Sequence, residues 1–387
     1  MNWRQAIAGI AVLASACTSV PPPGSAVTLE VAGAPISAEE TGQAFLYRLP
    51  GAEDPAGIAA QTWSMLGRED RAAMTGDSEY LPQPCTPVPD APRGRESVVA
   101  AIAQQAATSR VVIVNESHTV TRHRETVRQL LGALRPLGFS VYAAETFSNA
   151  EDEADPVAQH SGLAWPHLFD GYYSREPAFG NAVREAKRLG YRLAAYEETP
   201  SQSAPDGSDR TSSIAARETA QAANLAVILA GMGPEERLLV HVGYSHAAET
   251  PLGQHGDLWM AARLKAATGI DPLTVSQTLC SSEGGEVFLA LLPEDRPAGM
   301  VDIVLSHPLT RFENGRPLWR RETGAIAVPI PDQLRRTGQP LIVEAFLAGE
   351  PLDAVPVDRV YLEPGEDIPL LLSPGSYRVR AVVPATG

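Results

Sequence analysis

The sequence predicts an α/β protein in which helices cover a parallel sheet, with a small β domain at the C-terminal end. From about residue 94, short continuous apolar runs alternate with amphipathic stretches, as expected for strands buried on both faces between helices. After about residue 301 the pattern changes to strands separated by Pro and Gly turns. The length of 387 residues suits two domains at roughly 100–200 residues each.

Residues 1–16 have the features of a signal peptide. Arg4 supplies the positive start, the apolar run 6–13 is too short to span a bilayer, and small residues precede Cys17. The segment resembles a bacterial lipoprotein signal, which implies cleavage before Cys17 and lipid on its sulfur. We therefore expect an exported protein anchored to the bacterial cell envelope and facing the periplasm. An ordinary secretory signal cut nearby is the alternative.

Residues 17–93 are expected to form a tether and an irregular N-terminal extension, because they carry scattered Pro and Gly with few periodic runs. Export would place the two remaining cysteines, Cys85 and Cys280, in an oxidising compartment. Only one pairing is available to them, so a Cys85–Cys280 disulfide is predicted.

The α/β domain is expected over residues 94–324. Its predicted strands are the apolar runs Val111–Val114, Val141–Ala144, Leu193–Tyr196, Leu238–Val242, Leu273–Ser276 and Val287–Leu292. The insertion of about residues 148–185, between the second and third strands, is expected to lie over the sheet edge as a lid. An ordinary helical excursion is the alternative.

Residues 325–387 are expected to form the β domain, an accessory unit without chemistry of its own. Its predicted strands are Leu341–Leu347, Val355–Leu362 and Pro369–Val383. Within the last run, Pro374-Gly375-Ser376 predicts a hairpin turn.

Polar side chains follow four successive strands of the predicted sheet. The first strand ends in Asn115-Glu116-Ser117-His118, the second in Glu145-Thr146, the third in Glu197-Glu198 and the fourth in Gly243-Tyr244-Ser245-His246. In an open parallel sheet, ligands bind at the carboxyl ends of the strands. The sequence therefore predicts one pocket lined by Glu and His, the alternative being solvated acidic residues at helix starts.

The helix after the first strand has one apolar stripe, formed by Val120, Val127, Leu131 and Leu134. His123 projects into this stripe and is expected to point inward, either as a satisfied core histidine or as part of the site. Arg124 lies at the edge of the stripe, and Arg122 is expected to face water.

The helix before the fourth strand places Arg217 and Asn224 on its apolar side. A guanidinium directed inward needs a partner, because an unpaired buried charge costs several kcal/mol. We expect Arg217 to order the acidic cluster and to keep Glu116 or Glu145 ionised. His241, inside the fourth strand, is expected to be a core residue.

These motifs resemble the ChaN-like haem-uptake family, which shares a superfamily with the erythromycin esterases and the Tiki-type proteases. The resemblance rests on residues 111–118, His123 and residues 143–147, on the helix 217–224 and on the turn 243–246. Four positions depart from the family pattern: Asn115, Thr119, Glu218 and Ser245. The resemblance implies the α/β fold, and the superfamily contains both hydrolases and haem-binding lipoproteins.

The first functional hypothesis is hydrolysis of an ester or amide bond by activated water. Its expected catalytic residues are Glu116, His118, Glu145, Arg217 and His246. Residues expected to contact substrate or support this group are His123, Arg124, Glu197 and Asn224. A divalent metal such as Zn²⁺ or Mn²⁺ held by Glu116, His118, Glu145 and His246 is a variant that the sequence leaves open.

Two other hypotheses remain. The same pocket could hold haem or another iron chelate without turnover. Alternatively, Ser245 could be a nucleophile, since Gly243-Tyr244-Ser245-His246-Ala247 resembles a nucleophile elbow. In every case the expected partners are a small molecule and, through the lipid, a membrane. With 46 acidic and 31 basic side chains, the formal charge of −15 argues against nucleic acid.

Overall fold

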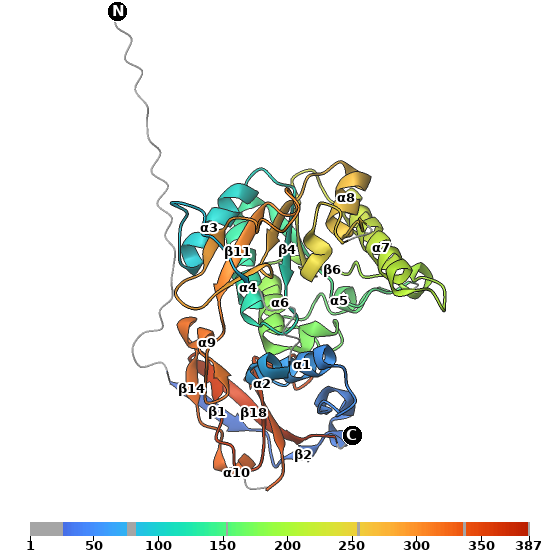
Figure 1. Cartoon of the computed structure of the whole chain (residues 1–387). Coiled ribbons are helices and arrows are strands. Elements are labelled where there is room, and N and C mark those ends of the chain that lie inside the picture. The colour runs from blue at the N-terminus through green and yellow to red at the C-terminus, as the bar shows by residue number, and fades with distance from the viewer. Residues whose placement is uncertain (1–25, 76–82, 152–153, 254–255, 336–337, 386–387) are drawn as a thin grey trace, which may run out of the picture.

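The computed structural model describes residues 26–75, 83–151, 154–253, 256–335 and 338–385. The predicted signal peptide and Cys17 lie outside these residues. A large α/β part and a smaller β part lie one above the other, with the first helices of the chain between them (Figure 1). No helix in the described ranges combines the length and the apolar character needed to cross a bilayer.

The α/β part is built on a nine-stranded sheet with the order β3-β9-β11-β8-β4-β7-β5-β6, in which β10 pairs with β11. All neighbours are parallel except β10, which is antiparallel to β11. The strands are β3 (Gln83–Pro84), β4 (Val111–Glu116), β5 (Phe139–Ala144), β6 (Arg192–Ala194), β7 (Arg237–Gly243), β8 (Leu273–Ser276), β9 (Cys280–Ser282), β10 (Phe288–Ala290) and β11 (Ile303–Pro308).

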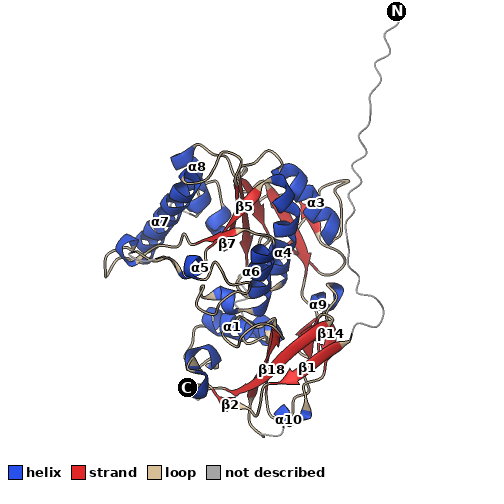
Figure 2. Ribbon diagram, turned by 180° about the vertical axis from the view of Figure 1, so that it is seen from behind, coloured by secondary structure: helices blue, strands red, loops and turns tan. Residues whose placement is uncertain are grey.

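Helices cover both faces of this sheet (Figure 2). One face carries α3 (Arg95–Ala106), α4 (Arg122–Leu134) and α6 (Pro177–Arg188), which bury an apolar cluster against β4 and β5. The other face carries α7 (Arg210–Ala230) and α8 (Met260–Thr268). The mostly parallel sheet flanked by helices is therefore as predicted, because its central strands are apolar along their whole length.

Two details of this part differ from the sequence analysis. The run 287–292 is an antiparallel edge strand, and β11 forms after residue 301, where the analysis expected the parallel pattern to end. Arg122 does not face water: it is 6% exposed and donates to the Pro308 carbonyl at 3.1 Å. Arg122 was expected to face water because β11 was not predicted. The end of β11 lies beside the start of α4, where Arg122 stands.

The β part is a five-stranded mixed sheet with the order β1-β18-β15-β16, in which β2 also pairs with β18; β1 and β2 are parallel to β18, and the other pairings are antiparallel. Its strands are β1 (Val27–Val31), β2 (Ile36–Ser37), β15 (Leu341–Leu347), β16 (Asp358–Leu362) and β18 (Gly375–Val383). Two short antiparallel pairs accompany it: β12 (Phe312–Glu313) with β13 (Arg316–Pro317), and β14 (Ile326–Val328) with β17 (Leu370–Leu372). The remaining helices are α1 (Ala56–Met65), α2 (Glu69–Thr75), α5 (Pro156–Gln159), α9 (Trp319–Glu322) and α10 (Asp332–Arg335).

The N-terminal region is more regular than the expected irregular extension. β1 pairs in parallel with β18, and Figure 1 shows these blue and red strands side by side. In β1, Val27, Leu29 and Val31 alternate with polar residues, and all three pack against the apolar core of the β part. This five-residue alternation is the period-2 signal of a half-buried strand.

The predicted hairpin at Pro374-Gly375-Ser376 is wrong. β17 pairs with β14, whereas β18 pairs with β15, β1 and β2, so this turn joins two different sheets. The Leu371 N–H in β17 donates to the Asp358 carboxylate at 2.6 Å, which holds β17 beside β16 instead of beside β18.

A disulfide joins Cys85 to Cys280, with the two Cα atoms 5.4 Å apart. Cys280 begins β9, and Cys85 directly follows β3, the strand that pairs with β9. The bond therefore fastens the edge of the large sheet to residues 195 positions earlier in the chain.

Asp358 joins several elements of the β part. Its fully buried carboxylate accepts hydrogen bonds from Arg316, Arg320 and the Leu371 N–H. Arg316 also donates to the Gly67 carbonyl at 2.7 Å, which connects the turn between α1 and α2 to the same centre. A buried charge with several partners is costly to break, because each remaining partner is left uncompensated.

We expect Asp358→Ala to lower the free energy of unfolding by about 3–5 kcal/mol, since Arg316 would be left buried without its carboxylate. The matched control is Asp367→Ala, which removes the 77% exposed partner of Arg335 and should cost about 0–1 kcal/mol. Urea unfolding measures both. Equal losses in the two variants would contradict the role given to Asp358.

Candidate functional site

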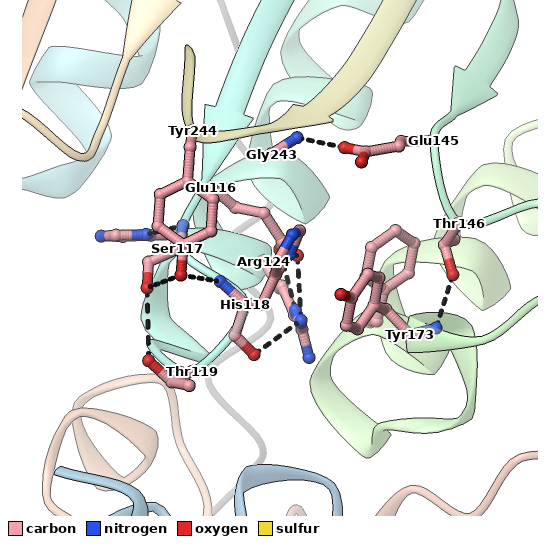
Figure 3. Close-up of polar contacts among 12 residues, drawn as sticks. Glu116, Ser117, His118, Thr119, Arg124, Glu145, Thr146, Tyr173, Gly243 and Tyr244 are labelled. Carbon is pink, nitrogen blue, oxygen red and sulfur yellow. Dashed lines mark hydrogen bonds and ion pairs between the residues drawn. The ribbon is translucent and has the colours of Figure 1, made fainter. Parts of the chain in front are cut away.

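At the carboxyl ends of β4, β5 and β7, Glu116, His118 and Glu145 lie close together (Figure 3), and His246 lies 3.5 Å from Glu145. Together these four residues form one polar group. The Nδ1 atom of His118 is 3.4 Å from Glu116 Oε1, so the carboxylate favours the tautomer with its proton on Nδ1. This leaves Nε2 as the nitrogen able to accept a proton.

Two tyrosines hold the His118 ring. The ring stacks on Tyr173 with centroids 4.1 Å apart and planes 13° apart, and the Tyr244 ring meets it edge-on at 4.9 Å. Figure 3 shows the two tyrosines on opposite sides of His118. The imidazole therefore has little freedom to rotate.

Gly243, the last residue of β7, leaves the room that His118 and Glu145 occupy. A Cβ atom at this position would lie 2.6 Å from His118 Cε1, 2.9 Å from His118 Nε2 and 3.1 Å from Glu145 Oε2. The Cε1–Nε2 edge of His118 and the Oε2 atom of Glu145 thus approach the same point of the backbone. Any residue larger than glycine must displace them.

Glu116 is buried and paired with Arg124. The guanidinium donates to both carboxylate oxygens, at 2.8 and 2.9 Å, and to Glu176 at 2.9 Å. His241 Nε2 lies 3.2 Å from Glu116 on the core side. Burial raises the pKa of Glu116, but Arg124 and His241 outweigh it and hold that pKa well below the ordinary value. Glu116 is therefore ionised beside His118.

Glu145 is held from three directions. It accepts from Arg217 at 2.7 Å and from the Gly243 N–H at 2.5 Å, and His246 Nε2 lies 3.5 Å away. Burial opposes ionisation, but His246, His118 and Arg217 together lower the pKa of Glu145 to about 2. This carboxylate is also ionised at neutral pH.

His246 has a carboxylate at each ring nitrogen, Glu145 near Nε2 and Glu218 Oε1 2.8 Å from Nδ1. Burial lowers the pKa of His246, but Glu145 and Glu218 outweigh burial and raise it above the ordinary value. His118 and His246 therefore have different surroundings, and the cationic form of His246 is the one its neighbours favour.

One face of α7 organises the segment after β6. Arg217 pairs with both Glu145 and Glu197, and Gln221 donates to both oxygens of Glu197 at 3.1 Å. Asn224 donates to the carbonyls of Tyr196 and Glu197 at 3.1 and 3.0 Å. The sequence analysis left open which carboxylate Arg217 serves: the structure pairs it with Glu145, and Arg124 takes the corresponding place at Glu116.

His123 lies apart from this group, although the sequence analysis allowed it a place in the site. Its Nδ1 accepts the Ser117 N–H at 3.0 Å, and its ring lies 5.0 Å from that of His307. Burial lowers the pKa of His123 to about 3, so the ring is neutral. It is a satisfied core histidine that fixes the backbone before His118.

Four residues that contact the site were not predicted from the sequence: Tyr173, Glu176, Tyr244 and Glu218. A capping signal does mark Glu176, which stands before Pro177 and accepts the N–H groups of Ala178 and Phe179 at the start of α6. Tyr244 has a positive φ of 34°, which is rare for a bulky residue and is stabilised by Asn115 donating to its carbonyl at 2.6 Å.

A cavity of about 300 Å³ opens beside this group. It is lined by Glu145, Thr146, Phe147, Ser148, Tyr172, Tyr173, Glu197 and Arg217. Tyr172 and Tyr173 belong to the insertion of residues 148–185, so this segment forms one wall of the cavity. Its volume is at the lower end of the range usual for small-molecule sites.

The residues present do not fit the metal variant or haem. Within the described ranges, no three His, Cys, Asp or Glu side chains are placed to hold one ion. Arg217, the cation that lines the cavity, already pairs with Glu145 and Glu197 and is not free to hold a haem propionate. The Tyr173 hydroxyl already donates to Gln61 at 3.2 Å.

Ser245 has no basic partner in the part of the chain that the structure describes. The ring nitrogens of His246 face Glu218 and Glu145, and His307 Nε2 bonds Gln277 at 2.9 Å. His255, the other downstream histidine considered for a serine hydrolase, lies outside the described residues. Among the described residues, none is placed to activate Ser245 as a nucleophile.

No protein-family model matches the chain, and no curated protein matches it. Among solved structures, it is similar to a bacterial protein toxin at 16% identity and a TM-score of 0.35, over 49% of this chain and 37% of the toxin. It is also similar to the type III effector HopBA1, at 15% identity and a TM-score of 0.37, over 57% of this chain and 97% of the effector. A third is RRSP, a MARTX toxin effector domain from Vibrio vulnificus, at 17% identity and a TM-score of 0.35, over 57% and 43% of the two chains. At these TM-scores the similarities assign neither family nor function.

The neutral state of His123 predicts a pH dependence of stability. The pKa of His123 is about 3 in the folded protein and about 6.5 when exposed, so between these values the unfolded chain binds the extra proton. Stability should therefore fall as pH falls from 6.5 toward 3, by about 1.4 kcal/mol per pH unit from this group. Urea unfolding of His123→Asn at a series of pH values measures this. The free energy of unfolding of the variant should change with pH less steeply than that of the wild type, by about 1.4 kcal/mol per pH unit. Equal slopes in the two proteins would contradict a buried neutral His123.

Proposed function

We propose that this protein hydrolyses ester or amide bonds with a water molecule activated by His118. The observation that carries the proposal is the Glu116–His118 pair: an ionised carboxylate at Nδ1 favours the tautomer whose Nε2 accepts a proton. A carboxylate that orients an imidazole in this way is the arrangement general-base catalysis requires.

In the proposed reaction, His118 Nε2 takes a proton from water as the water oxygen attacks the carbonyl carbon. The tetrahedral intermediate then collapses, and His118 returns the proton to the leaving oxygen or nitrogen. His246 and Arg217 supply positive charge beside the developing oxyanion. Glu145 positions both cations, and Arg124 positions Glu116.

We further propose that the α/β part belongs with the ChaN-like and erythromycin-esterase superfamily. The motifs between residues 111 and 277 support this, because they supply Glu116, His118, Glu145, Arg217 and His246 to one group. Export and lipid attachment at Cys17 remain part of the proposal on the strength of the N-terminal sequence. We do not propose haem binding, since the cation that lines the cavity, Arg217, is already paired with Glu145 and Glu197.

We expect His118→Ala to reduce kcat/KM by about 10²–10⁴-fold, the usual contribution of a general base. Steady-state hydrolysis of aryl esters and anilides, with 4-nitrophenyl acetate as the first substrate, measures it. Ser245→Ala is the matched control and should keep wild-type turnover. Full activity in His118→Ala would contradict the mechanism, as would loss of activity in Ser245→Ala with fluorophosphonate labelling of Ser245. A wild-type protein inactive on the whole panel would contradict hydrolysis itself.

Gly243→Ala should reduce kcat/KM by about 100-fold or more, because the new Cβ would displace His118 and Glu145 from the positions they share. The control is Gly132→Ala in α4, where a Cβ would meet nothing within 4 Å. This second change should leave kcat/KM unchanged and stabilise the fold by about 0.4–1 kcal/mol. Wild-type kinetics in Gly243→Ala would show that the His118 position is not required.

A further inference from the structure

Arg175 lies outside the catalytic group, between two exposed aromatic rings. Its guanidinium carbon is 5.0 Å from the ring centroid of Phe45 and 5.8 Å from that of Tyr172. Phe45 is 56% exposed and Tyr172 49% exposed, which is unusual for large aromatic residues. The two rings come from distant parts of the chain, one before α1 and the other from the insertion.

The Arg175 guanidinium has no anionic partner among the described residues. Its single hydrogen bond there runs from Nε to the Leu168 carbonyl at 2.9 Å. Its two terminal nitrogens are without a described partner, and neither is a buried unsatisfied atom, so both can be reached from outside. Arg124 and Arg217, by contrast, each hold two carboxylates.

Arg175 is a cation that can still accept an anionic partner. Burial is the main cause that lowers its pKa, Tyr172 raises it and Arg359 lowers it, but an arginine remains charged at any physiological pH. A planar guanidinium with two free N–H pairs matches a carboxylate in the bidentate geometry. The exposed rings on either side offer flat apolar surface to whatever carries that carboxylate.

This cluster adjoins the cavity of the catalytic group. Tyr172 lines that cavity together with Glu145 and Arg217, and the same side chain contacts Arg175. The next residue, Tyr173, stacks on His118. A ligand held at Arg175 would therefore lie across Tyr172 from the cavity that Glu145 and Arg217 line.

We propose that Phe45, Tyr172 and Arg175 form a subsite that binds a carboxylate of the substrate, carried on a flat apolar group, and places the neighbouring ester or amide bond in the cavity. The substrate class is thus an ester or amide that bears a free carboxylate. This proposal rests on the proposed hydrolytic function, but the subsite itself binds without turnover.

The test measures binding of 4-fluorobenzoate by ¹⁹F NMR titration to the wild-type protein, Arg175→Met, Arg175→Lys and His118→Ala. Arg175→Met keeps the apolar stem and should weaken binding at least about tenfold. Arg175→Lys keeps the positive charge but lacks the planar guanidinium. Its affinity for 4-fluorobenzoate should lie between those of Arg175→Met and the wild type. His118→Ala should bind like the wild type. Equal binding by Arg175→Met, or no binding by the wild type, would overturn the subsite.

Turnover separates this proposal from the hydrolytic one. For the wild type, kcat/KM should be higher for the 4-nitrophenyl monoester of terephthalate, whose carboxylate is carried on a flat ring, than for neutral 4-nitrophenyl benzoate, and Arg175→Met should lose this preference. Preserved preference in the variant would overturn the subsite. Binding of 4-fluorobenzoate without turnover of either ester would contradict hydrolysis and leave the subsite supported. A circular dichroism melt of each variant confirms that it is folded.

Discussion

The site depends on one buried ion pair, that of Arg124 with Glu116. Burial alone would neutralise the carboxylate, and a neutral Glu116 could not fix the tautomer of His118. Arg124 also binds Glu176, which caps α6, so the charge that keeps Glu116 ionised joins β4 to the helix in which the insertion ends. Arg124 thus contributes both to the electrostatics of the site and to the packing of its wall.

The two histidines of the group are differentiated by what faces them. His118 has one carboxylate and two tyrosine rings, whereas His246 lies between two carboxylates that favour its cation. A group that accepts a proton and a group that carries positive charge are both needed when negative charge develops on a carbonyl oxygen. Because their surroundings differ, His118 is suited to accept a proton and His246 to carry positive charge.

The sequence was sufficient for the strands and for the residues at their carboxyl ends, because fully apolar runs and the ends of parallel strands follow strong rules. It failed where pairing depends on distant partners. β1 is a short alternating strand whose significance appears only beside β18, and β11 forms within a stretch rich in turn residues. Tyr173 and Tyr244 were missed for a related reason, since nothing in their local sequence indicates that two rings converge on His118.

The pairing of β1 and β2 with β18 has a consequence for how the chain can be shortened. Together these two strands cover the outer side of β18 over residues 375–379 and 382–383. A polypeptide trimmed to start at α1 would leave a row of free N–H and C=O groups along that side. Such an open border is a template for another molecule's strand, so the first described residues protect the protein against self-association.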